Sequence, residues 1–454
     1  MVLIDLWLFV RQTCILTGLT FLFFAGNTRA EVFKPQLFKL ANGLKVVVIS
    51  NHRAPLVTQL VMYKVGAMDE PPGQTGIAHF LEHLMFKGTK NLAPGEFSKI
   101  VARNGGQENA FTSRDYTGYH QSFSSDRLEI MMQIESDRMC NLTLTQDDIE
   151  PERQVVLEER NTRVENNPSA LLSEEVNAAF YINHPYRRPI IGWRHEIESI
   201  SRSNLLAFYN KWYAPNNAIL VIAGDVNASD VLGLAKKYYG GIPSKKLPLR
   251  VKWVEPRHKS DRRITLRHKQ VRQPQWLKKF ITPGVMQDAS STRALEILSE
   301  IIGGGTSSRI YQSIVVEQKI AASAGAWYDG ETRGPGVFSF FATPLPGKSI
   351  LDVERAMEKL IGDLIEKGVS EEEVSMAVTR LQDAAIFARD GLYGPAVILG
   401  RALAIGLSVD YVEQWPQRLA SVTNDDVNRV IRMVFGRPGS VTGLLLSEKR
   451  VRQD

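Results

Sequence analysis

The segment His79-Phe-Leu-Glu82-His83 restricts what this chain can become more than any other feature of its 454 residues. If the segment is helical, His79 and His83 lie about one turn apart, and both imidazoles can bind one metal ion. Glu82 falls on the same side of that helix, where it can take a proton from a metal-bound water. The alternative is an amphipathic helix that buries its apolar residues and leaves both histidines in solvent.

A third ligand has to come from elsewhere, because zinc sites that hydrolyse peptides usually have three protein ligands and one open position. Glu159 is the best candidate in the sequence. It lies in a charged segment, residues 146–165, which is predicted to be a helix. Glu152 precedes it by two turns on the same face, so Glu152 can hydrogen-bond a ligating imidazole. The alternative is that both glutamates are simply solvated, as glutamates on exposed helices usually are.

Five motifs of the chain resemble those of one known family, the inverted zinc peptidases that include pitrilysin, insulin-degrading enzyme and the mitochondrial processing peptidase. The motifs lie at residues 79–89, 105–112, 152–159, 184–186 and 303–309. They are spread over nearly the whole chain after residue 30. The resemblance implies a zinc-dependent metalloendopeptidase that hydrolyses peptides or unfolded segments.

The same resemblance implies a role for each residue of the site. One zinc ion per chain would be held by His79, His83 and Glu159, since Glu159 rather than its neighbour fits the register of the family. Glu82 would be the general base, and Glu152 would support a ligating imidazole. An edge strand would pair with the backbone of an extended peptide substrate. That strand consists of Asn109, Ala110, Phe111 and Thr112, for which an ordinary core strand is the alternative.

One departure from the family pattern concerns the second half of the chain. Members that act as one chain carry an arginine and a tyrosine, seven residues apart, after the motif at 303–309. Val315 and Ala322 occupy those positions here, and neither can bind a substrate carbonyl or an oxyanion. We therefore expect the catalytic subunit of a heterodimer whose homologous, non-catalytic partner supplies the missing pair. The alternatives are a self-sufficient homodimer and a non-catalytic structural subunit.

Strand and helix signals follow in the same order in the two halves of the chain. We therefore expect an α+β fold of two similar domains, each a mostly antiparallel β-sheet covered by helices. Residues 31–245 would form the domain with the zinc site, residues 246–262 a linker, and residues 263–454 the second domain. Capped helix starts near Ser201 and Thr423 favour a duplication, although such caps also arise independently. Regular helices are expected at about 293–302 and 307–318.

The first thirty residues are a separate matter. Residues 6–10 and 14–25 are strongly apolar, and the stretch ends with Asn27-Thr-Arg-Ala30. This pattern predicts a secretory signal that is cleaved after Ala30, and hence a periplasmic protein with no stable membrane span. An uncleaved membrane anchor is the alternative.

After cleavage, Cys140 would be the only cysteine left, and we expect a buried thiol. The net charge of +6 is spread along the chain, which argues against a nucleic-acid-binding face.

Overall fold

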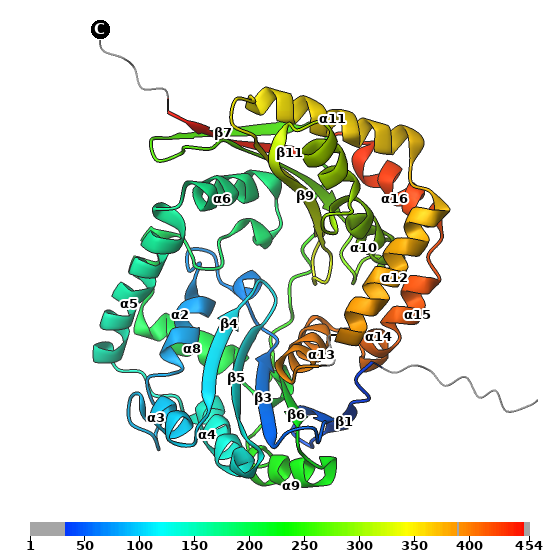
Figure 1. The fold of residues 1–454 in the computed structure, drawn as a ribbon. Helices are drawn as coiled ribbons and strands as arrows, with labels where there is room; N and C mark the ends of the chain where they lie inside the picture. Colours follow the sequence, from blue (N-terminus) through cyan, green and yellow to red (C-terminus); the bar gives the residue numbers. More distant parts are fainter. Residues whose placement is uncertain (1–31, 388–389, 449–454) are drawn as a thin grey trace, which may run out of the picture.

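A computed structural model describes residues 32–387 and 390–448 of the protein. Two β-sheets lie at opposite ends of the molecule, and helices pack on both faces of each sheet (Figure 1). This arrangement confirms the predicted α+β fold with two similar sheet-and-helix units. The predicted signal segment, residues 1–30, lies outside the described residues. No helix in the described ranges is both long enough and apolar enough to span a membrane.

The first sheet has six strands in the order β1-β2-β6-β3-β5-β4. In that order they are β1 (Gln36–Lys39), β2 (Lys45–Ser50), β6 (Ala218–Gly224), β3 (Leu56–Tyr63), β5 (Thr117–Ser124) and β4 (Gln107–Thr112). β2 and β6 run parallel, and the other neighbours are antiparallel. Every residue of β6 is buried, which fits a central apolar strand covered on both faces. β4 lies at the edge, where it pairs with β5.

The second sheet has five strands in the order β7-β11-β8-β10-β9. In that order they are β7 (Arg262–His268), β11 (Val441–Ser447), β8 (Gln275–Thr282), β10 (Gly336–Pro344) and β9 (Ala321–Asp329). Its parallel pair is β7 and β11. Strands β2 to β6 therefore correspond to strands β7 to β11 both along the chain and across the sheet. Residues 245–261, between the two sheets, form neither helix nor strand.

The helices of the first half cover its sheet and carry the candidate site. They are α2 (Ile77–Leu84), α3 (Glu96–Arg103), α4 (Leu128–Asn141), α5 (Gln146–Arg160), α6 (Pro168–Phe180), α7 (Arg194–Ser199), α8 (Arg202–Trp212) and α9 (Ala228–Tyr239). A π-helical turn, η3 (Asn161–Glu165), extends α5 to the end of the predicted helical segment. α8 begins with a capping box between Ser201 and Asn204 and leads toward the closing strand β6.

The helices of the second half follow the same plan. They are α10 (Ala289–Gly303), α11 (Ile350–Lys367), α12 (Glu371–Phe387), α13 (Tyr393–Ile405), α14 (Val409–Glu413), α15 (Trp415–Ala420) and α16 (Asn424–Phe435). α16 begins with a capping box between Thr423 and Asp426 and leads toward the closing strand β11. The two capped helices predicted from the sequence are thus both present at equivalent places.

The structure corrects two local predictions. The region 307–318 holds a π-helical turn, η6 (Tyr311–Glu317), in place of a regular helix. Three successive β-branched residues, residues 314–316, disfavour regular α-helix there. Cys140 is exposed rather than buried, because Met139 takes the inward position in the last turn of α4.

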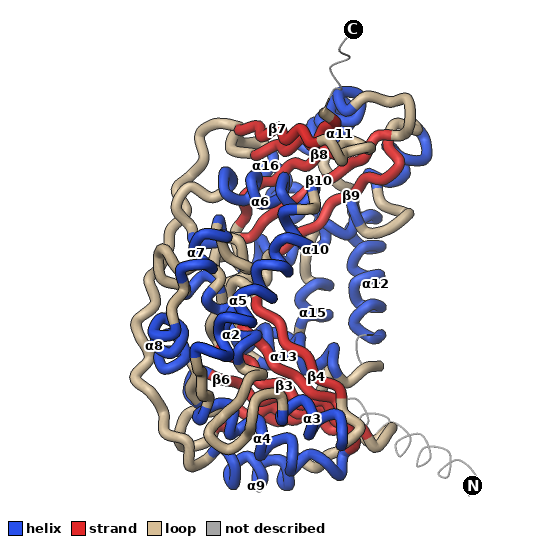
Figure 2. The backbone as a smooth tube through the Cα atoms, turned by 90° about the vertical axis from the view of Figure 1, so that its left-hand side faces the viewer, coloured by secondary structure: helices blue, strands red, loops and turns tan. Residues whose placement is uncertain are grey.

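Each sheet is covered on one face by a helix from the other half of the chain. α13 packs on the first sheet, and Leu399 and Leu403 share a buried cluster with Leu60. α6 packs on the second sheet, where a Cβ on Gly443 would lie 2.7 Å from a methyl carbon of Val176. Both helices lie between the two sheets (Figure 2). The two halves are therefore interlocked rather than merely joined.

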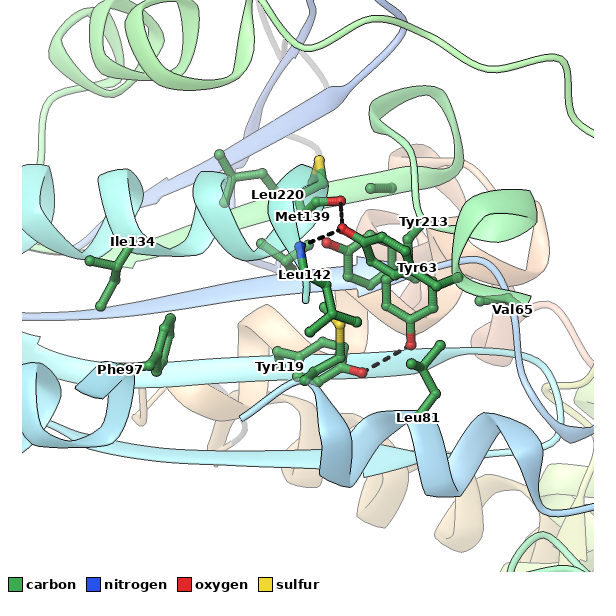
Figure 3. Packing of buried hydrophobic residues seen from close by; sticks show 14 of the residues in the cluster. Tyr63, Val65, Leu81, Phe97, Tyr119, Ile134, Met139, Leu142, Tyr213 and Leu220 are labelled. Atoms are coloured by element: carbon green, nitrogen blue, oxygen red, sulfur yellow. Dashed lines mark hydrogen bonds between the residues drawn. The ribbon is translucent and has the colours of Figure 1, made fainter. Parts of the chain in front are cut away.

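The largest buried cluster lies between the first sheet and the helices on its other face. Tyr63, Tyr119 and Tyr213 pack together in it (Figure 3). The hydroxyl oxygens of Tyr119 and Tyr213 are 2.9 Å apart and hydrogen-bonded. Leu81 of α2 belongs to the same cluster. One side of α2 is thus anchored in a packed core, which leaves the opposite side for polar residues.

Candidate active site

The amino end of α2 is fixed by carboxylates from other parts of the chain. Gly76 precedes the first residue of the helix; its φ of 85° lies in the left-handed region, and it has no side chain that could cap the helix. Glu70 accepts hydrogen bonds from the amides of Gly76 and Ala78, at 3.1 and 3.0 Å. Glu196 accepts another from the amide of Thr75, at 2.6 Å. These bonds satisfy amides that the start of a helix would otherwise leave without partners.

One face of α2 packs into the core, and the other carries the two histidines. Its apolar side chains are fully buried: Ile77, Phe80, Leu81 and Leu84. On the other face, the His79 side chain is only about 10% exposed and that of His83 about 22%. The alternative with two solvated histidines is therefore wrong.

The structure brings His79, His83 and Glu159 together from α2 and the end of α5. Oε2 of Glu159 lies 3.6 Å from Nε2 of His79 and 3.2 Å from Nε2 of His83. Ligands about 2.1 Å from a tetrahedral zinc ion are roughly 3.4 Å from one another. Within the described part of the chain, these residues form the one group of three or more His, Cys, Asp or Glu side chains that could hold a metal ion. The donor set and its spacing fit zinc.

Glu152 orients one of the two imidazoles. Its Oε1 accepts a hydrogen bond from Nδ1 of His83 at 2.8 Å, so that Nε2 points to the other candidate ligands. Lys87 binds the second oxygen of Glu152 at 2.5 Å. The hydrogen bond from His83, more than that from Lys87, keeps the pKa of Glu152 below its usual value. Lys87 did not emerge as a site residue from the sequence, although it lies one helical turn after His83.

The two histidines differ in their tendency to bind a proton. Burial, with a smaller contribution from the neighbouring imidazole, lowers the pKa of His79 to about 4. Burial acts in the same direction on His83, but its hydrogen bonds with Glu152 and Glu159 raise its pKa to about 9. His79 is therefore neutral at physiological pH and can offer a lone pair to a metal ion. Its Nδ1 has no hydrogen-bond partner among the described residues.

Glu82 lies beside the ligand group, and strand β4 holds it there. Oγ1 of Thr112 donates a hydrogen bond to Oε2 of Glu82 at 2.5 Å. The Glu82 residue is about 9% exposed, and burial raises the pKa of its carboxyl group. Thr112 was expected to contact substrate through its backbone, and the structure adds this contact between its side chain and the candidate base.

A cavity of about 930 Å³ opens over the site. Its walls include the three candidate ligands, Glu82, and the β4 residues Asn109, Ala110, Phe111 and Thr112. β4 is an edge strand, and in this stretch Asn109 is exposed and the other three residues are half-buried, so the alternative of a core strand is excluded. The amide of Ala110 donates to the side chain of Asn109 at 2.8 Å.

Arg163 is a further residue of the cavity that the sequence did not single out. Its Nη1 lies 2.6 Å from Oε1 of Glu159, while its side chain remains 71% exposed. It follows Glu159 by four residues, and charges at this spacing meet on a helix surface. It lies in the π-helical turn η3, and such turns occur frequently at functional sites.

The positions that lack the expected arginine and tyrosine lie in the second half. Val315 is half-buried in η6 against the second core, and Ala322 is exposed on β9. Arg309 is bound by Glu373 and donates to the carbonyl of Gly368 at 3.0 Å. Arg309 therefore serves the packing of the second half.

Two family models match the chain. The model described as Insulinase (Peptidase family M16) matches residues 45–193, which include all the candidate site residues. The model described as Peptidase M16 inactive domain matches residues 199–381. The chain is 32% identical to Zinc protease PqqE of Helicobacter pylori, over 79% of this chain and 80% of that protein. It is 28% identical to Uncharacterized zinc protease ML0855 of Mycobacterium leprae, over 88% of each.

Solved structures share the whole architecture. A protease from Helicobacter pylori matches with a TM-score of 0.85 and 29% identity, and the match covers 91% of this chain and 99% of that one. A putative M16-like peptidase from Alicyclobacillus acidocaldarius matches with a TM-score of 0.79 and 22% identity, over 92% and 99%. The periplasmic protease PqqL from Escherichia coli matches with a TM-score of 0.77 and 20% identity, over 91% of this chain and 47% of that one. The last two likenesses show the fold alone.

Proposed function

This chain belongs to the insulinase family of peptidases, family M16, and on that premise we propose that it is a zinc-dependent metalloendopeptidase acting on peptides or unfolded segments. One observation carries the proposal. His79, His83 and Glu159 each offer one ligand atom, and these three atoms lie within 4.8 Å of one another, beside the buried carboxyl group of Glu82. All four line a cavity that is bordered by an edge strand.

The zinc ligands in this proposal are His79, His83 and Glu159, with one ion per chain. When bound, zinc would supply Lewis-acid chemistry that polarises a peptide carbonyl and makes water a better nucleophile. Glu152 would keep His83 in the orientation that directs Nε2 to the site. Arg163 would hold one oxygen of Glu159 and leave the other for the metal ion.

Glu82 would act as the general base. It would take the proton of the attacking water and later deliver it to the leaving amine. Because Thr112 holds Oε2, Oε1 is the oxygen left for proton transfer. Burial raises the pKa of Glu82 above its usual value, and a carboxylate with a higher pKa is a more effective base.

Strand β4 would bind the substrate by backbone pairing. It has an open edge, and its residues Asn109 to Thr112 line the cavity beside Glu82. An extended peptide that adds to this edge would displace the Asn109 side chain from the amide of Ala110. Pairing of this kind selects for an extended conformation more than for a sequence, which fits unfolded segments.

We further propose that the chain is the catalytic subunit of a heterodimer. Neither Val315 nor Ala322 has a side chain that can stabilise an oxyanion, and Arg309 is engaged by Glu373. A homologous partner would supply an arginine and a tyrosine to the cavity. A self-sufficient enzyme is the second candidate, and one observation favours it: Arg163 already places a guanidinium group in the cavity.

Export to the periplasm, with cleavage after Ala30, is proposed from the sequence alone. Amino-terminal sequencing of the chain recovered from a periplasmic extract should begin at Glu31. A chain that keeps its first residue and sediments with the membranes would instead support the anchored alternative.

The first experiment measures cleavage of an extended quenched peptide by the purified chain, with bound zinc quantified. Glu82→Gln should retain zinc and lose cleavage, because the substitution removes the base and keeps the volume of the side chain. A wild-type chain that binds no zinc would overturn the metallopeptidase proposal and favour the non-catalytic subunit. Cleavage by Glu82→Gln at the wild-type rate would exclude Glu82 as the base.

The same assay separates the two assembly hypotheses. A chain that binds zinc and cleaves only after a homologous partner is added supports the heterodimer. Full cleavage by the chain alone contradicts it, and Arg163→Gln then tests the second candidate. Arg163→Gln should lower cleavage by the isolated chain about 100-fold if Arg163 stabilises an oxyanion.

A further inference from the structure

A second cavity, of about 280 Å³, lies beside α13 and shares no residue with the cavity over the metal site. Residues from six separate places in the chain form its walls. Those that matter here are Phe33, Glu296, Glu331, Ile398, Tyr411 and Trp415. The volume is near the lower end for small-molecule sites and suits a ligand of a few heavy atoms.

Two carboxyl groups in this cavity have no counter-charge in contact. Glu296 accepts a hydrogen bond from Nε1 of Trp415 at 3.2 Å. Glu331 has no hydrogen-bond partner among the residues that the structure describes. No lysine, arginine or histidine nitrogen in the same ranges lies within 4.0 Å of either carboxylate. Burial, with repulsion from Glu331, raises the pKa of Glu296 to about 8. Arg293 lowers the pKa of Glu296 and Arg401 that of Glu331 from a distance, but neither arginine bonds to these half-buried carboxylates, so their oxygens remain open to a ligand.

Tyr411 provides an independent observation. The residue is 7% exposed, and its hydroxyl group has no hydrogen-bond partner in the described structure. Tyr411 lines the same cavity as Glu296 and Glu331, and burial, followed by the charges of these two carboxylates, raises the pKa of its hydroxyl group. A buried hydroxyl without a partner is costly, and this one can accept a hydrogen bond from a ligand.

We propose that this cavity binds the primary ammonium group of a small amine or of a peptide amino terminus. An ammonium group has three N–H donors, which match the carboxylates of Glu296 and Glu331 and the hydroxyl oxygen of Tyr411. The aromatic ring of Trp415 suits a cation as well, and Ile398 can pack against a short alkyl chain. The site is separate from the proposed peptidase chemistry and does not depend on zinc.

Isothermal titration calorimetry of the full chain with n-butylamine tests the proposal, and n-butanol serves as the uncharged probe of similar shape. Butylamine should bind and butanol should not. Glu331→Gln should weaken binding of the amine at least about tenfold, because it removes the negative charge that pairs with the ammonium group. Tyr411→Phe should weaken it several-fold, because it removes a hydrogen-bond acceptor. Asp410→Asn, an exposed neighbour of Tyr411, is the matched control and should leave the affinity unchanged.

A tripeptide with a free amino terminus and its N-acetylated form distinguish the two sources of the ammonium group. Binding of only the free form assigns the site to peptide termini, whereas binding of butylamine but neither tripeptide assigns it to small amines. Equal binding of butylamine and butanol, or no loss of affinity in both Glu331→Gln and Tyr411→Phe, would overturn the proposal. The heat signal should be the same in Glu82→Gln, so a failure here is distinct from a failure of the peptidase proposal.

Discussion

The two halves of this molecule share one frame and differ in the helix that it carries. In the first half, eight-residue α2 lies between β3 and β4 and presents His79, Glu82 and His83. In the second half, fifteen-residue α10 lies between β8 and β9, and apart from Ser291 and Thr292 its buried residues are apolar. Glu159 lies on α5, the helix that follows α4. The helix at the equivalent place in the second half is α12, which carries no group of possible metal ligands among the described residues. The frame alone therefore does not specify the chemistry, which depends on a short helix beside an edge strand.

The largest expected effect tests whether the first half of the chain can fold without the second half. A chain ending after residue 245 lacks α13 and would expose Leu60, Met62 and Val221, which are fully buried. Burial of each such side chain is worth about 1.5–3 kcal/mol. The sum approaches the whole stability of a typical domain, about 5–15 kcal/mol. We expect no cooperative thermal transition for this fragment by circular dichroism.

Adding back the second half provides the control for that truncation. Co-expression of residues 246–454 should restore a soluble complex, because α13 and α6 can then cover the two sheets. A cooperative transition in the isolated first half would show that the interlock contributes little, and the halves would then be independent domains.

The next prediction tests whether the metal site, which only the first half has among the described residues, depends on single residues. Glu159→Gln should reduce bound zinc from about one ion per chain to a small fraction, because a neutral amide replaces the anionic ligand. Cleavage should fall on the order of thousandfold or more. Glu158→Gln is the matched control: this neighbour is exposed and bonds to Asn161, so its zinc content and activity should stay close to wild type. Equal losses in both variants would refute the assignment of Glu159.

Periodic features of the site could be predicted from the sequence, whereas its long-range contacts could not. Helical spacing was enough to relate His79 to His83 and Glu152 to Glu159. The edge strand predicted at Asn109 to Thr112 lies within β4. The hydrogen bond from Thr112 to Glu82 joins residues that are thirty positions apart in the chain. The hydrogen bond by which Glu70 caps α2 also has no counterpart in a helical or strand repeat. Neither contact has a signal in a single sequence, because each depends on how separate elements pack.

The exchange of α6 and α13 between the sheets was also missed, for a related reason. Both helices have apolar residues on more than one side. Such a pattern predicts that a helix is buried, but it does not indicate on which sheet the helix packs. The second-half prediction of a regular helix at 307–318 failed because a local preference for helix does not exclude the wider π-helical turn. Partner choice and local winding are set by tertiary packing.

A moderate effect is expected at the residue that orients an imidazole. Glu152→Gln removes the charge that binds the N–H of His83 and the ammonium group of Lys87. Loss of such support typically lowers metal affinity about 10–100-fold. Competition with a chelator measures this affinity directly. Glu150→Gln, on the exposed side of the same helix, should leave the affinity unchanged, and a loss as large as that of Glu152→Gln would contradict the orienting role.

The smallest expected effects test the shared frame itself. Ser201→Ala and Thr423→Ala remove equivalent caps from α8 and α16, and each should lower the free energy of unfolding by about 1 kcal/mol. If the interlocked halves unfold together, both variants shift the midpoint of one urea transition, and the double variant shows the sum of the two effects. If the halves unfold separately, each substitution shifts only its own transition. The two variants thus distinguish one cooperative molecule from two linked domains while leaving the zinc site untouched.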